Sequence, residues 1–449
     1  MSEGKMESIW LGETELPRFP KLKEDIETEV LIIGGGLAGI LTAHFLEQKR
    51  VDCVLVEKGR IFGGTSGNTT AKITFQHGLI YHKLLKSRGP KGAKLYLDAQ
   101  RAAFDKYAEL CENIDCDYEI KDNFVYSQNR KKLEKEMDAL RRLGYEAEFH
   151  EKIPLPVDAA GAVMFPNQAQ FNPAKFISEI VKDLKIYENT FVREMIGTTA
   201  VTDEAKIRAK KVVVATHFPF INKHGSYFLK LYQHRSYVIA LENGPKLDGM
   251  YVDDDKKGMS FRNYGDFLLL GGGGGRTGKK CGGWNEIRSF AKEHFPAAKE
   301  KFFWAAQDCM SLDGVPYIGQ YSKRTPDLYV ASGFNKWGVT GSMLTRMILS
   351  DLVTGKKNEF AGAFSPSRSI LKPQLLINGF EAVTNLLSFS KKRCPHLGCA
   401  LKWNKTERSW DCPCHGSRFS EGGKLLDGPS NGDLKGYKKP PGKYPGAFL

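Results

Sequence analysis

The 449-residue sequence lacks a long apolar run. No segment approaches the roughly 18 consecutive apolar residues that a membrane-spanning helix needs. The opening residues, MSEGKMESIW, also lack the basic start and apolar core of a secretory signal. We therefore expect no integral membrane segment and a cytoplasmic location.

A regular disulfide framework is absent as well. The chain has nine cysteines, but four of them fall in two short C-terminal runs and the other five are scattered without a pattern. These five are expected to be buried as small apolar residues. Because 449 residues exceed one ordinary core, two or three domains are predicted.

Acidic residues are fewer than basic ones: 52 Asp and Glu stand against 66 Lys and Arg, which gives a net charge of +14. Residues 361–449 contribute fourteen Lys and Arg against six Asp and Glu. These basic residues are not interleaved with aromatics in a known nucleic-acid-binding module, so no nucleic acid partner is expected. Two interpretations stay open. The basic end is a solvated surface, or it steers an acidic ferredoxin- or flavodoxin-like electron carrier.

A mixed pattern of cysteine and histidine occurs near the C-terminal end. Each of two runs offers one cysteine and one histidine as a ligand pair, and fifteen residues separate the pairs. Zinc fingers usually take two cysteines from one run and two histidines from the other. Two thiolates on one iron and two imidazoles on the other instead form a [2Fe-2S] centre. We predict this cluster; the alternatives are a zinc site, or cysteines and histidines that sit in loops without binding a metal. The predicted ligands are Cys394, His396, Cys412 and His415.

The two runs resemble the ligand loops of the Rieske family. In Rieske proteins of respiratory complexes, a second cysteine pair at the positions of Cys399 and Cys414 forms a disulfide. The resemblance implies the same pairing here, whereas free thiols are the usual state of cytosolic cysteines. The strands that precede the first loop in a full Rieske domain are missing. We expect only a small β cluster-binding subdomain at 391–446, which must pack on the rest of the chain.

Residues 28–57 have the pattern of a dinucleotide-binding unit. A strand predicted at 28–33 leads into Gly34, Gly36 and Gly39, and a helix is predicted over 40–48. These glycines permit a tight turn, close approach of a pyrophosphate and close packing of helix on strand. A second strand at 51–56 ends at Glu57, where a carboxylate would bind the adenosine ribose.

Three later segments resemble the D-amino-acid oxidase and glycine oxidase superfamily. Residues 63–72 are similar to its flavin-cradling loop, 211–216 to a strand that ends in Ala-Thr-Gly, and 313–341 to its closing flavin motif. His217 replaces the glycine of the second segment. The resemblance covers roughly 28–360 and implies FAD as the cofactor. The implied contacts are Gly34, Gly36, Gly39, Glu57, Lys58, Thr65, Ser66, Asn68, Thr69, Ala71, Ala215, Gly333, Trp337, Gly338 and Thr340.

The resemblance also implies the fold, an α/β Rossmann-like FAD-binding domain with an inserted α+β substrate domain. FAD-binding parts are expected at about 28–78, 151–217 and 306–360, and substrate or cap parts at about 79–150 and 218–305. Residues 1–27 form an N-terminal extension and 361–390 a linker. The linker's apolar stretch, 375–387, is expected to dock on the protein body, with contact to a membrane surface as the alternative.

A glycine run at 271–275 raises the question of a second dinucleotide site. Gly273, Gly275 and Gly278 match the same motif, but no helix starts at the last glycine and no acidic strand end follows. The superfamily has a loop near the flavin at this position. We therefore favour a substrate-facing role for Arg276, whose guanidinium would pair with a carboxylate. Weaker catalytic candidates are His77, Tyr237 and Arg235.

The favoured function is that of an FAD-dependent dehydrogenase. The superfamily resemblance implies an amine or amino-acid C–N bond as the site of oxidation. The Rieske cluster would exchange electrons one at a time with an external carrier. One alternative is a nicotinamide-dependent flavin and Rieske reductase, and another is a non-enzymatic redox relay or sensor.

Phe419 bears on the cluster's reduction potential. Rieske proteins of high potential often have tyrosine here, with its hydroxyl bonded to a ligand sulfur. We predict a value in the lower part of the roughly −150 to +300 mV Rieske range, with the bond from the Ser417 hydroxyl retained.

Overall fold

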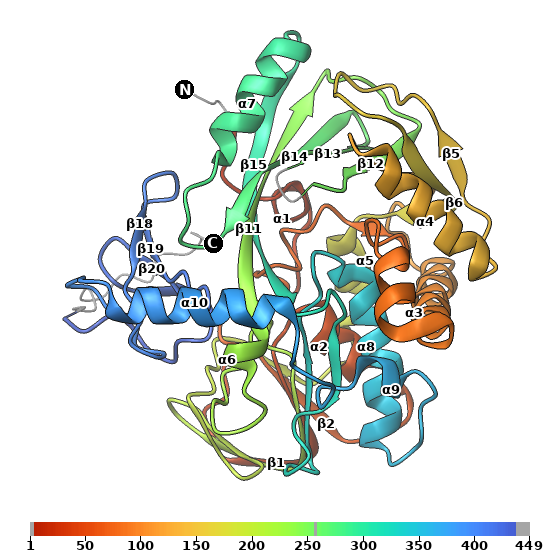
Figure 1. Cartoon of the computed structure of the whole chain (residues 1–449). Helices are drawn as coiled ribbons and strands as arrows, with labels where there is room; N and C mark the ends of the chain where they lie inside the picture. Colours follow the sequence, from red (N-terminus) through yellow and green to blue (C-terminus); the bar gives the residue numbers. More distant parts are fainter. Residues whose placement is uncertain (1–3, 256–257, 437–449) are drawn as a thin grey trace.

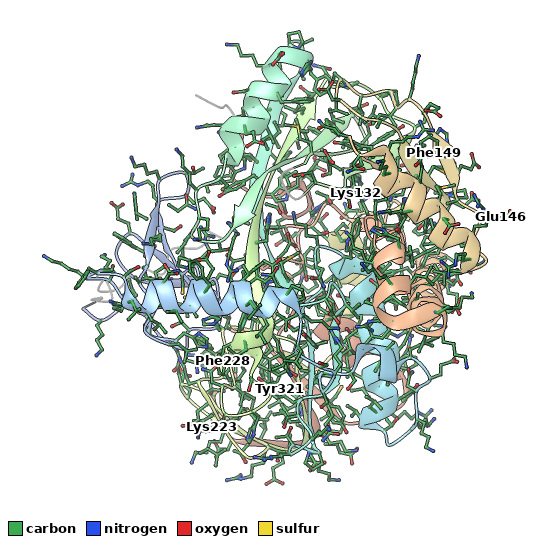
Figure 2. The ribbon with its side chains drawn as sticks, in the orientation of Figure 1. Lys132, Glu146, Phe149, Lys223, Phe228 and Tyr321 are labelled. Atoms are coloured by element: carbon green, nitrogen blue, oxygen red, sulfur yellow. The ribbon has the colours of Figure 1, made fainter. Side chains whose placement is uncertain are left out.

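A computed structural model describes residues 4–255 and 258–436 of the chain. Three β-sheets organise this part of the molecule (Figure 1). Side chains fill the space between the ribbons (Figure 2). The main core lies where helices pack between the two larger sheets.

The first sheet has the order β16-β17-β10-β1-β2-β7, and its central strands run parallel. The central strands are rich in Val, Ile and Leu, as expected for strands covered on both faces. Its strands are β1 (Ile26–Ile33), β2 (Cys53–Val56), β7 (Ile186–Tyr187), β8 (Glu194–Ile196), β9 (Thr199–Val201), β10 (Lys206–Val214), β16 (Tyr317–Gln320) and β17 (Leu328–Ser332).

The second sheet is mixed and has the order β15-β11-β14-β13-β12-β4-β6-β3, with β5 paired to β6. Its strands are β3 (Lys72–Ile73), β4 (Glu119–Tyr126), β5 (Glu148–His150), β6 (Ala162–Gln170), β11 (Leu231–Glu242), β12 (Gly249–Asp253), β13 (Ser260–Tyr264), β14 (Phe267–Arg276) and β15 (Lys299–Ser311). Strand β6 lies in a part assigned from sequence to FAD binding, but the structure places it in this sheet.

The helices cover these sheets and link their strands. Helix α3 is long and kinks at Gly89, which has φ 68° and precedes Pro90. The helices are α1 (Ile9–Glu13), α2 (Leu37–Gln48), α3 (Tyr81–Cys111), α4 (Arg130–Arg142), α5 (Pro173–Ile180), α6 (Tyr227–Lys230), α7 (Gly283–His294), α8 (Gly338–Val353), α9 (Ala361–Phe364) and α10 (Pro373–Leu387). No helix in the described part of the chain is both long and apolar enough to cross a membrane.

The third sheet is small and antiparallel, and it lies beside α10 (Figure 1). Its strands are β18 (Lys402–Asn404), β19 (Ser409–Asp411), β20 (Arg418–Ser420) and β21 (Leu425–Asp427). The expected fold class is thereby confirmed: a Rossmann-like part, an inserted α+β part and a small β subdomain. The last residues of the expected subdomain, 437–446, lie outside the described residues.

The glycine run at 271–275 is not the loop expected from the resemblance. It lies within β14, which pairs with β11 and β13 in antiparallel register. A dinucleotide motif instead needs a turn between a parallel strand and a helix. The run therefore lacks the setting of a nicotinamide site.

Candidate functional site

One cavity of about 1090 Å³ lies between the two larger sheets and the small C-terminal sheet. Strands β1, β2 and β10 end at this cavity, and Gly34, Glu57 and Ala215 follow them in the sequence and line it. Ligands of parallel sheets bind at such carboxyl ends. Exposed residues at the edge, including Lys58 and Asn431, show that the cavity opens to solvent.

The glycine motif is packed so tightly that side chains are excluded. Gly34 has φ 115°, and a Cβ there would lie 2.5 Å from the carbonyl oxygen of Ala215. A Cβ on Gly39 would lie 2.0 Å from the carbonyl oxygen of Gly34. Helix α2 therefore begins close against β1, with its N-terminal amides directed at the cavity, where a pyrophosphate is favoured.

Glu57 fixes the turn around the motif. Its carboxylate accepts hydrogen bonds from the backbone N–H of Gly35 at 2.8 Å and of Gly59 at 2.9 Å. The carboxylate thus lies at the cavity edge, next to the glycine motif, as an adenosine-binding acid must.

The hydroxyl-rich loop at 63–72 is held from two sides. The Trp10 indole, in the N-terminal extension, donates to the carbonyl of Thr69 at 2.7 Å. From β15, the Trp304 indole donates to the carbonyl of Asn68 at 3.0 Å. The Ser66 hydroxyl accepts from the N–H of Leu37 at 2.9 Å, at the start of α2. These anchors hold the loop at the cavity wall.

Most of the residues predicted to contact FAD line the cavity. Those that line it are Gly34, Gly36, Glu57, Lys58, Thr65, Ser66, Asn68, Thr69, Ala215, Trp337 and Gly338. Gly39, Ala71, Gly333 and Thr340 do not line it. Thr340 is buried behind the cavity wall, where its hydroxyl is hydrogen-bonded to the wall residue His77. A cradle of glycine and hydroxyl groups at the end of a parallel sheet fits the phosphates and ribose of FAD.

Arg276 is not substrate-facing, and the sequence-based expectation is corrected. It does not line the cavity. Its Nε donates to the carbonyl of Pro413 at 3.0 Å, and its guanidinium lies over the ring of Tyr232. The reason is the position of Arg276 at the last residue of β14, where the second cysteine and histidine loop packs.

His77 lines the cavity but is fixed within the wall. Its Nδ1 lies 2.7 Å from the Tyr96 hydroxyl and its Nε2 lies 3.0 Å from the Thr340 hydroxyl. Its ring stacks on Trp337 with centroids 5.0 Å apart. Burial lowers the pKa of His77 to about 3, so the imidazole is neutral near pH 7.

Sequence reasoning missed several charged residues on the cavity wall, among them Asp308 and Lys336. Asp308 lies on β15, and Lys336 lies in the turn before α8. Lys336 and the preceding Asn335 both have positive φ, at 72° and 53°, an uncommon conformation for residues other than glycine. Burial lowers the pKa of the Lys336 ammonium. The turn between Gly333 and Gly338 could have drawn attention to Lys336. Hydrophobic periodicity, however, does not show where a side chain in a turn points.

The two cysteine and histidine loops face each other at the end of the small sheet. The rings of His396 and His415 have centroids 4.9 Å apart. Both Nδ1 atoms are buried and lack a hydrogen-bond partner within the described residues. Burial lowers the pKa of His415 to about 4, so its imidazole is neutral near pH 7. Two buried, unpaired Nδ1 atoms on loops that also carry buried cysteines fit an iron–sulfur cluster.

The other ring nitrogens bond the part of the chain that precedes residue 361, called the FAD-binding body below. His415 Nε2 lies 3.0 Å from the carbonyl oxygen of Phe228, which is labelled below α10 in Figure 2. His396 Nε2 lies 3.0 Å from the Asn222 side-chain oxygen. Such contacts fix the orientation of an imidazole ligand.

Four cysteines gather here, so sulfur proximity alone does not select the ligands. The sulfurs of Cys399, Cys412 and Cys414 all lie within 4.8 Å of one another. Cys399 and Cys414 are free thiols. The disulfide implied by the Rieske resemblance is therefore not formed between these two cysteines in this structure.

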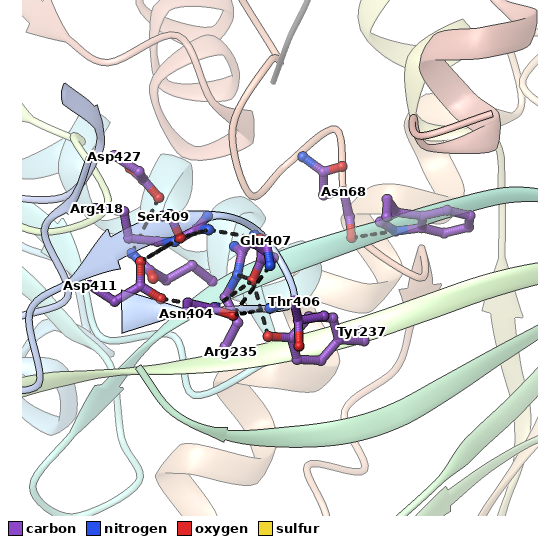
Figure 3. A network of polar contacts seen from close by, with 12 residues as sticks. Asn68, Arg235, Tyr237, Asn404, Thr406, Glu407, Ser409, Asp411, Arg418 and Asp427 are labelled. Atoms are coloured by element: carbon purple, nitrogen blue, oxygen red, sulfur yellow. Dashed lines mark hydrogen bonds and ion pairs between the residues drawn. The ribbon is translucent and has the colours of Figure 1, made fainter. Parts of the chain in front are cut away.

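A buried ionic network joins the small sheet to the body (Figure 3). The Glu407 carboxylate binds Arg235 of β11 and Arg418 of β20, and their side chains are 4%, 10% and 8% exposed. The Tyr237 hydroxyl donates to the same carboxylate at 3.0 Å. Burial would raise the pKa of Glu407, but the two guanidinium groups hold it at about 2. Arg235 and Tyr237, predicted as catalytic candidates, therefore bind the small subdomain.

The small subdomain also forms part of the cavity wall. Gln307 on β15 donates to the carbonyl of Gly416 at 2.9 Å, and Gln233 on β11 donates to the carbonyl of His415 at 3.1 Å. The subdomain residues that line the cavity are Glu407, Arg408, Arg418, Ser420, Leu426, Asp427, Gly428, Ser430 and Asn431.

Two protein-family models match the chain. The model described as FAD dependent oxidoreductase (DAO) matches residues 29–352. The Rieske [2Fe-2S] domain model matches residues 380–438. Together they cover the FAD-binding body and the small C-terminal subdomain.

Curated relatives support both parts. The chain is 32% identical over 495 residues to the "Putative Rieske 2Fe-2S iron-sulfur protein YhfW" of Bacillus subtilis (strain 168), and the match covers 96% of this chain and 97% of that protein. A local match, 51% identical over 37 residues, is to the cytochrome b6-f complex iron-sulfur subunit of Nostoc punctiforme. It covers 8% of this chain and 21% of that subunit.

Solved structures share the fold of the body. Glycine oxidase from Geobacillus kaustophilus has a TM-score of 0.64 at 22% identity, over 77% of this chain and 99% of that one. L-proline dehydrogenase from P. horikoshii also has a TM-score of 0.64, at 16% identity, over 77% and 98% of the two chains. Both comparisons concern the fold alone.

Proposed function

Because the chain belongs to the FAD-dependent oxidoreductase (DAO) family and carries a Rieske [2Fe-2S] domain, we propose that it is a dehydrogenase of amines or amino acids. Bound FAD would accept a hydride from the carbon that bears the amine nitrogen, leaving a C=N bond, and the cluster would pass the two electrons one at a time to an external carrier. The protein orients the substrate, excludes water and holds the two cofactors at a fixed separation.

The shared cavity is the observation that carries this proposal. Residues of the FAD-binding body and of the Rieske subdomain line the same space. His415 bonds the body through its Nε2. The backbone carbonyl of His415 accepts a hydrogen bond from Gln233, and that of Pro413 accepts one from Arg276. A rigid connection of this kind suits electron transfer within one molecule. The cavity opens to solvent, which suits a substrate-binding site better than a protein that only relays electrons between its cofactors.

Charges on the cavity wall support an amino acid as the substrate. Asp308 and Lys336 place a carboxylate and an ammonium group on the same cavity wall. An amino acid carries the two opposite charges, so its ammonium would pair with Asp308 and its carboxylate with Lys336. His77 is neutral and held by two hydrogen bonds, which makes it a positioning residue for the Trp337 side of the cavity.

Four residues are proposed as the cluster ligands: Cys394 and Cys412 for one iron, and His396 and His415 for the other. The buried, unpaired Nδ1 atoms support the two histidines. Cys399 and Cys414 would then pack beside the cluster without binding iron. The external carrier is proposed to approach this basic end of the chain.

An anaerobic titration tests the function. We expect at least one member of a panel of amines and amino acids to bleach the flavin absorbance and then reduce the cluster, seen as its electron paramagnetic resonance signal. NADH and NADPH serve as comparison donors. Rapid bleaching by either would favour the nicotinamide-dependent reductase, and silence across the whole panel would contradict the dehydrogenase.

Replacing Phe419 with tyrosine is expected to raise the reduction potential of the cluster. Phe419 is fully buried among the cysteines of the two loops, so a new hydroxyl there would bond a ligand sulfur and stabilise the reduced cluster. Protein-film voltammetry measures the shift. The Phe419→Leu variant adds no hydroxyl and controls for packing. An unchanged potential in Phe419→Tyr would contradict the prediction, as would a wild-type potential near the top of the Rieske range.

A further inference from the structure

Helix α10 turns its apolar side chains away from the protein. Leu376 is 78% exposed, Phe380 69% and Leu387 75%, and these residues recur at the spacing of one helix face. The helix lies across the surface beside the Rieske subdomain (Figure 1). The outward set, named the α10 patch, is Leu371, Leu376, Ile377, Phe380, Val383, Leu386, Leu387 and Phe389.

The opposite face of α10 is polar and faces the protein. Asn378 is buried and accepts a hydrogen bond from Arg276 Nη1 at 3.0 Å. Glu381 pairs with Lys279 at 2.8 Å, and Asn385 is buried next to the first cluster loop. A surface helix normally buries its apolar stripe. The stretch therefore docks on the body as expected, but it does so through polar groups, and its apolar side chains face outward.

The exposure is concentrated in this one region. Among the large hydrophobic side chains exposed in the described residues, nine lie between Leu371 and Leu397 and three lie elsewhere. Leu397 is 40% exposed and follows the proposed ligand His396 directly. Contiguous exposed apolar surface of this kind marks an interaction site.

Basic residues stand at both ends of the patch. Lys372 precedes the helix, and Lys391, Lys392 and Arg393 follow it. The one acidic residue of the helix, Glu381, is turned inward and paired. The surface thus combines a wide apolar face with cationic ends, which is the composition of helices that lie in the plane of an anionic bilayer.

We propose that the α10 patch docks this protein on a membrane containing anionic phospholipid. Pairing with a second copy is disfavoured by charge. In an antiparallel pair Lys372 would meet Lys391 of the other copy at both ends, and in a parallel pair each lysine would meet its own equivalent. Anionic lipid headgroups neutralise both ends instead. The helix has 15 residues, so it would lie in the interface without crossing it.

Docking in this orientation brings the first cluster loop to the lipid surface, since Leu397 belongs to the same exposed region. Resting on the proposed function, this places electron exchange with the external carrier at the membrane. The docking itself does not depend on any activity, so its test stands even if the proposed substrate class is wrong.

Co-sedimentation of the full-length holoenzyme with vesicles tests the proposal. We expect binding to vesicles of phosphatidylcholine with phosphatidylglycerol, weaker binding to phosphatidylcholine alone, and weakening by salt. The double variant Phe380→Glu, Leu387→Glu should bind at least about tenfold less, because two large apolar side chains no longer enter the lipid. Flavin absorbance and the cluster's resonance signal verify that the variant is folded and loaded.

The matched control is Ile196→Glu, which alters a residue that is 62% exposed on β8, outside the patch. It should bind vesicles as the wild type does. Wild-type protein that does not sediment with the anionic vesicles overturns the proposal, as does equal binding of the double variant. Self-association that the double variant abolishes, without vesicle binding, would identify a second copy as the occupant and also overturn it.

Discussion

Replacing Glu407 with alanine is expected to lower the free energy that holds the Rieske subdomain on the body by about 3–5 kcal/mol. The change leaves Arg235 and Arg418 buried and facing each other without the shared carboxylate. It also leaves the Tyr237 hydroxyl without its acceptor. Urea unfolding followed by cluster circular dichroism should show an early transition of the subdomain.

The control for this variant lies in the same subdomain. Arg408 and Glu421 form an ion pair whose side chains are 74% and 60% exposed. Because solvent screens such a pair, Arg408→Ala should cost less than about 1 kcal/mol. Equal unfolding of the two variants would contradict the assigned role of the buried network.

The same network predicts an acid transition. The pKa of Glu407 is held at about 2 in the folded protein, against an ordinary value of 4.5. A depressed pKa contributes stability that is present above the ordinary value and is lost as the pH falls toward the folded one. In the wild type, we expect the contact between the Rieske subdomain and the body to weaken between about pH 4.5 and pH 2. The Glu407→Ala variant should lack this pH-dependent part of the stability.

Replacing Cys412 with serine is expected to abolish the iron–sulfur cluster. Serine removes a thiolate ligand from one iron, and a Rieske centre does not persist with three of its four ligands. Iron and acid-labile sulfide should fall to background, and the resonance signal of the reduced cluster should vanish. Electron delivery to a one-electron acceptor should be lost with it.

Two further cysteine variants make this experiment specific. Cys399→Ser should retain iron, although its sulfur lies within 4.8 Å of that of Cys412. Cys53→Ser, which changes a thiol on β2, should behave as the wild type does. Loss of iron in Cys399→Ser together with retention in Cys412→Ser would show that the proposed ligand set is wrong.

The sequence allowed the two cofactor regions to be predicted because both follow local rules. A glycine turn between strand and helix has one backbone solution, and Gly34 and Gly36 line the cavity as expected. Paired cysteines and histidines in short loops come together wherever the loops meet. The resemblance supplied FAD and the Rieske cluster, and the family models support both.

Residues that act between distant parts of the chain could not be predicted in this way. Arg276 and Arg235 were expected near a substrate, but their partners, Pro413 and Glu407, are more than one hundred residues away in the sequence. The apolar stretch at 375–387 was likewise recognised in the sequence, but the composition of that stretch did not show which of its side chains meet the protein. Such contacts depend on how the Rieske subdomain packs on the body, and the spacing of residues within a short sequence motif does not predict that packing.

Because the Rieske subdomain forms part of the wall of the flavin cavity, binding of one cofactor would be coupled to binding of the other. Binding energies at coupled sites are reciprocal, so whatever a loaded cluster contributes to holding FAD, FAD returns to the loaded cluster. Under iron limitation, newly made chains would then hold FAD less firmly. Chains without either cofactor expose more of their interior and are preferred substrates for proteolysis. Iron supply would in this way set how much flavin enzyme accumulates.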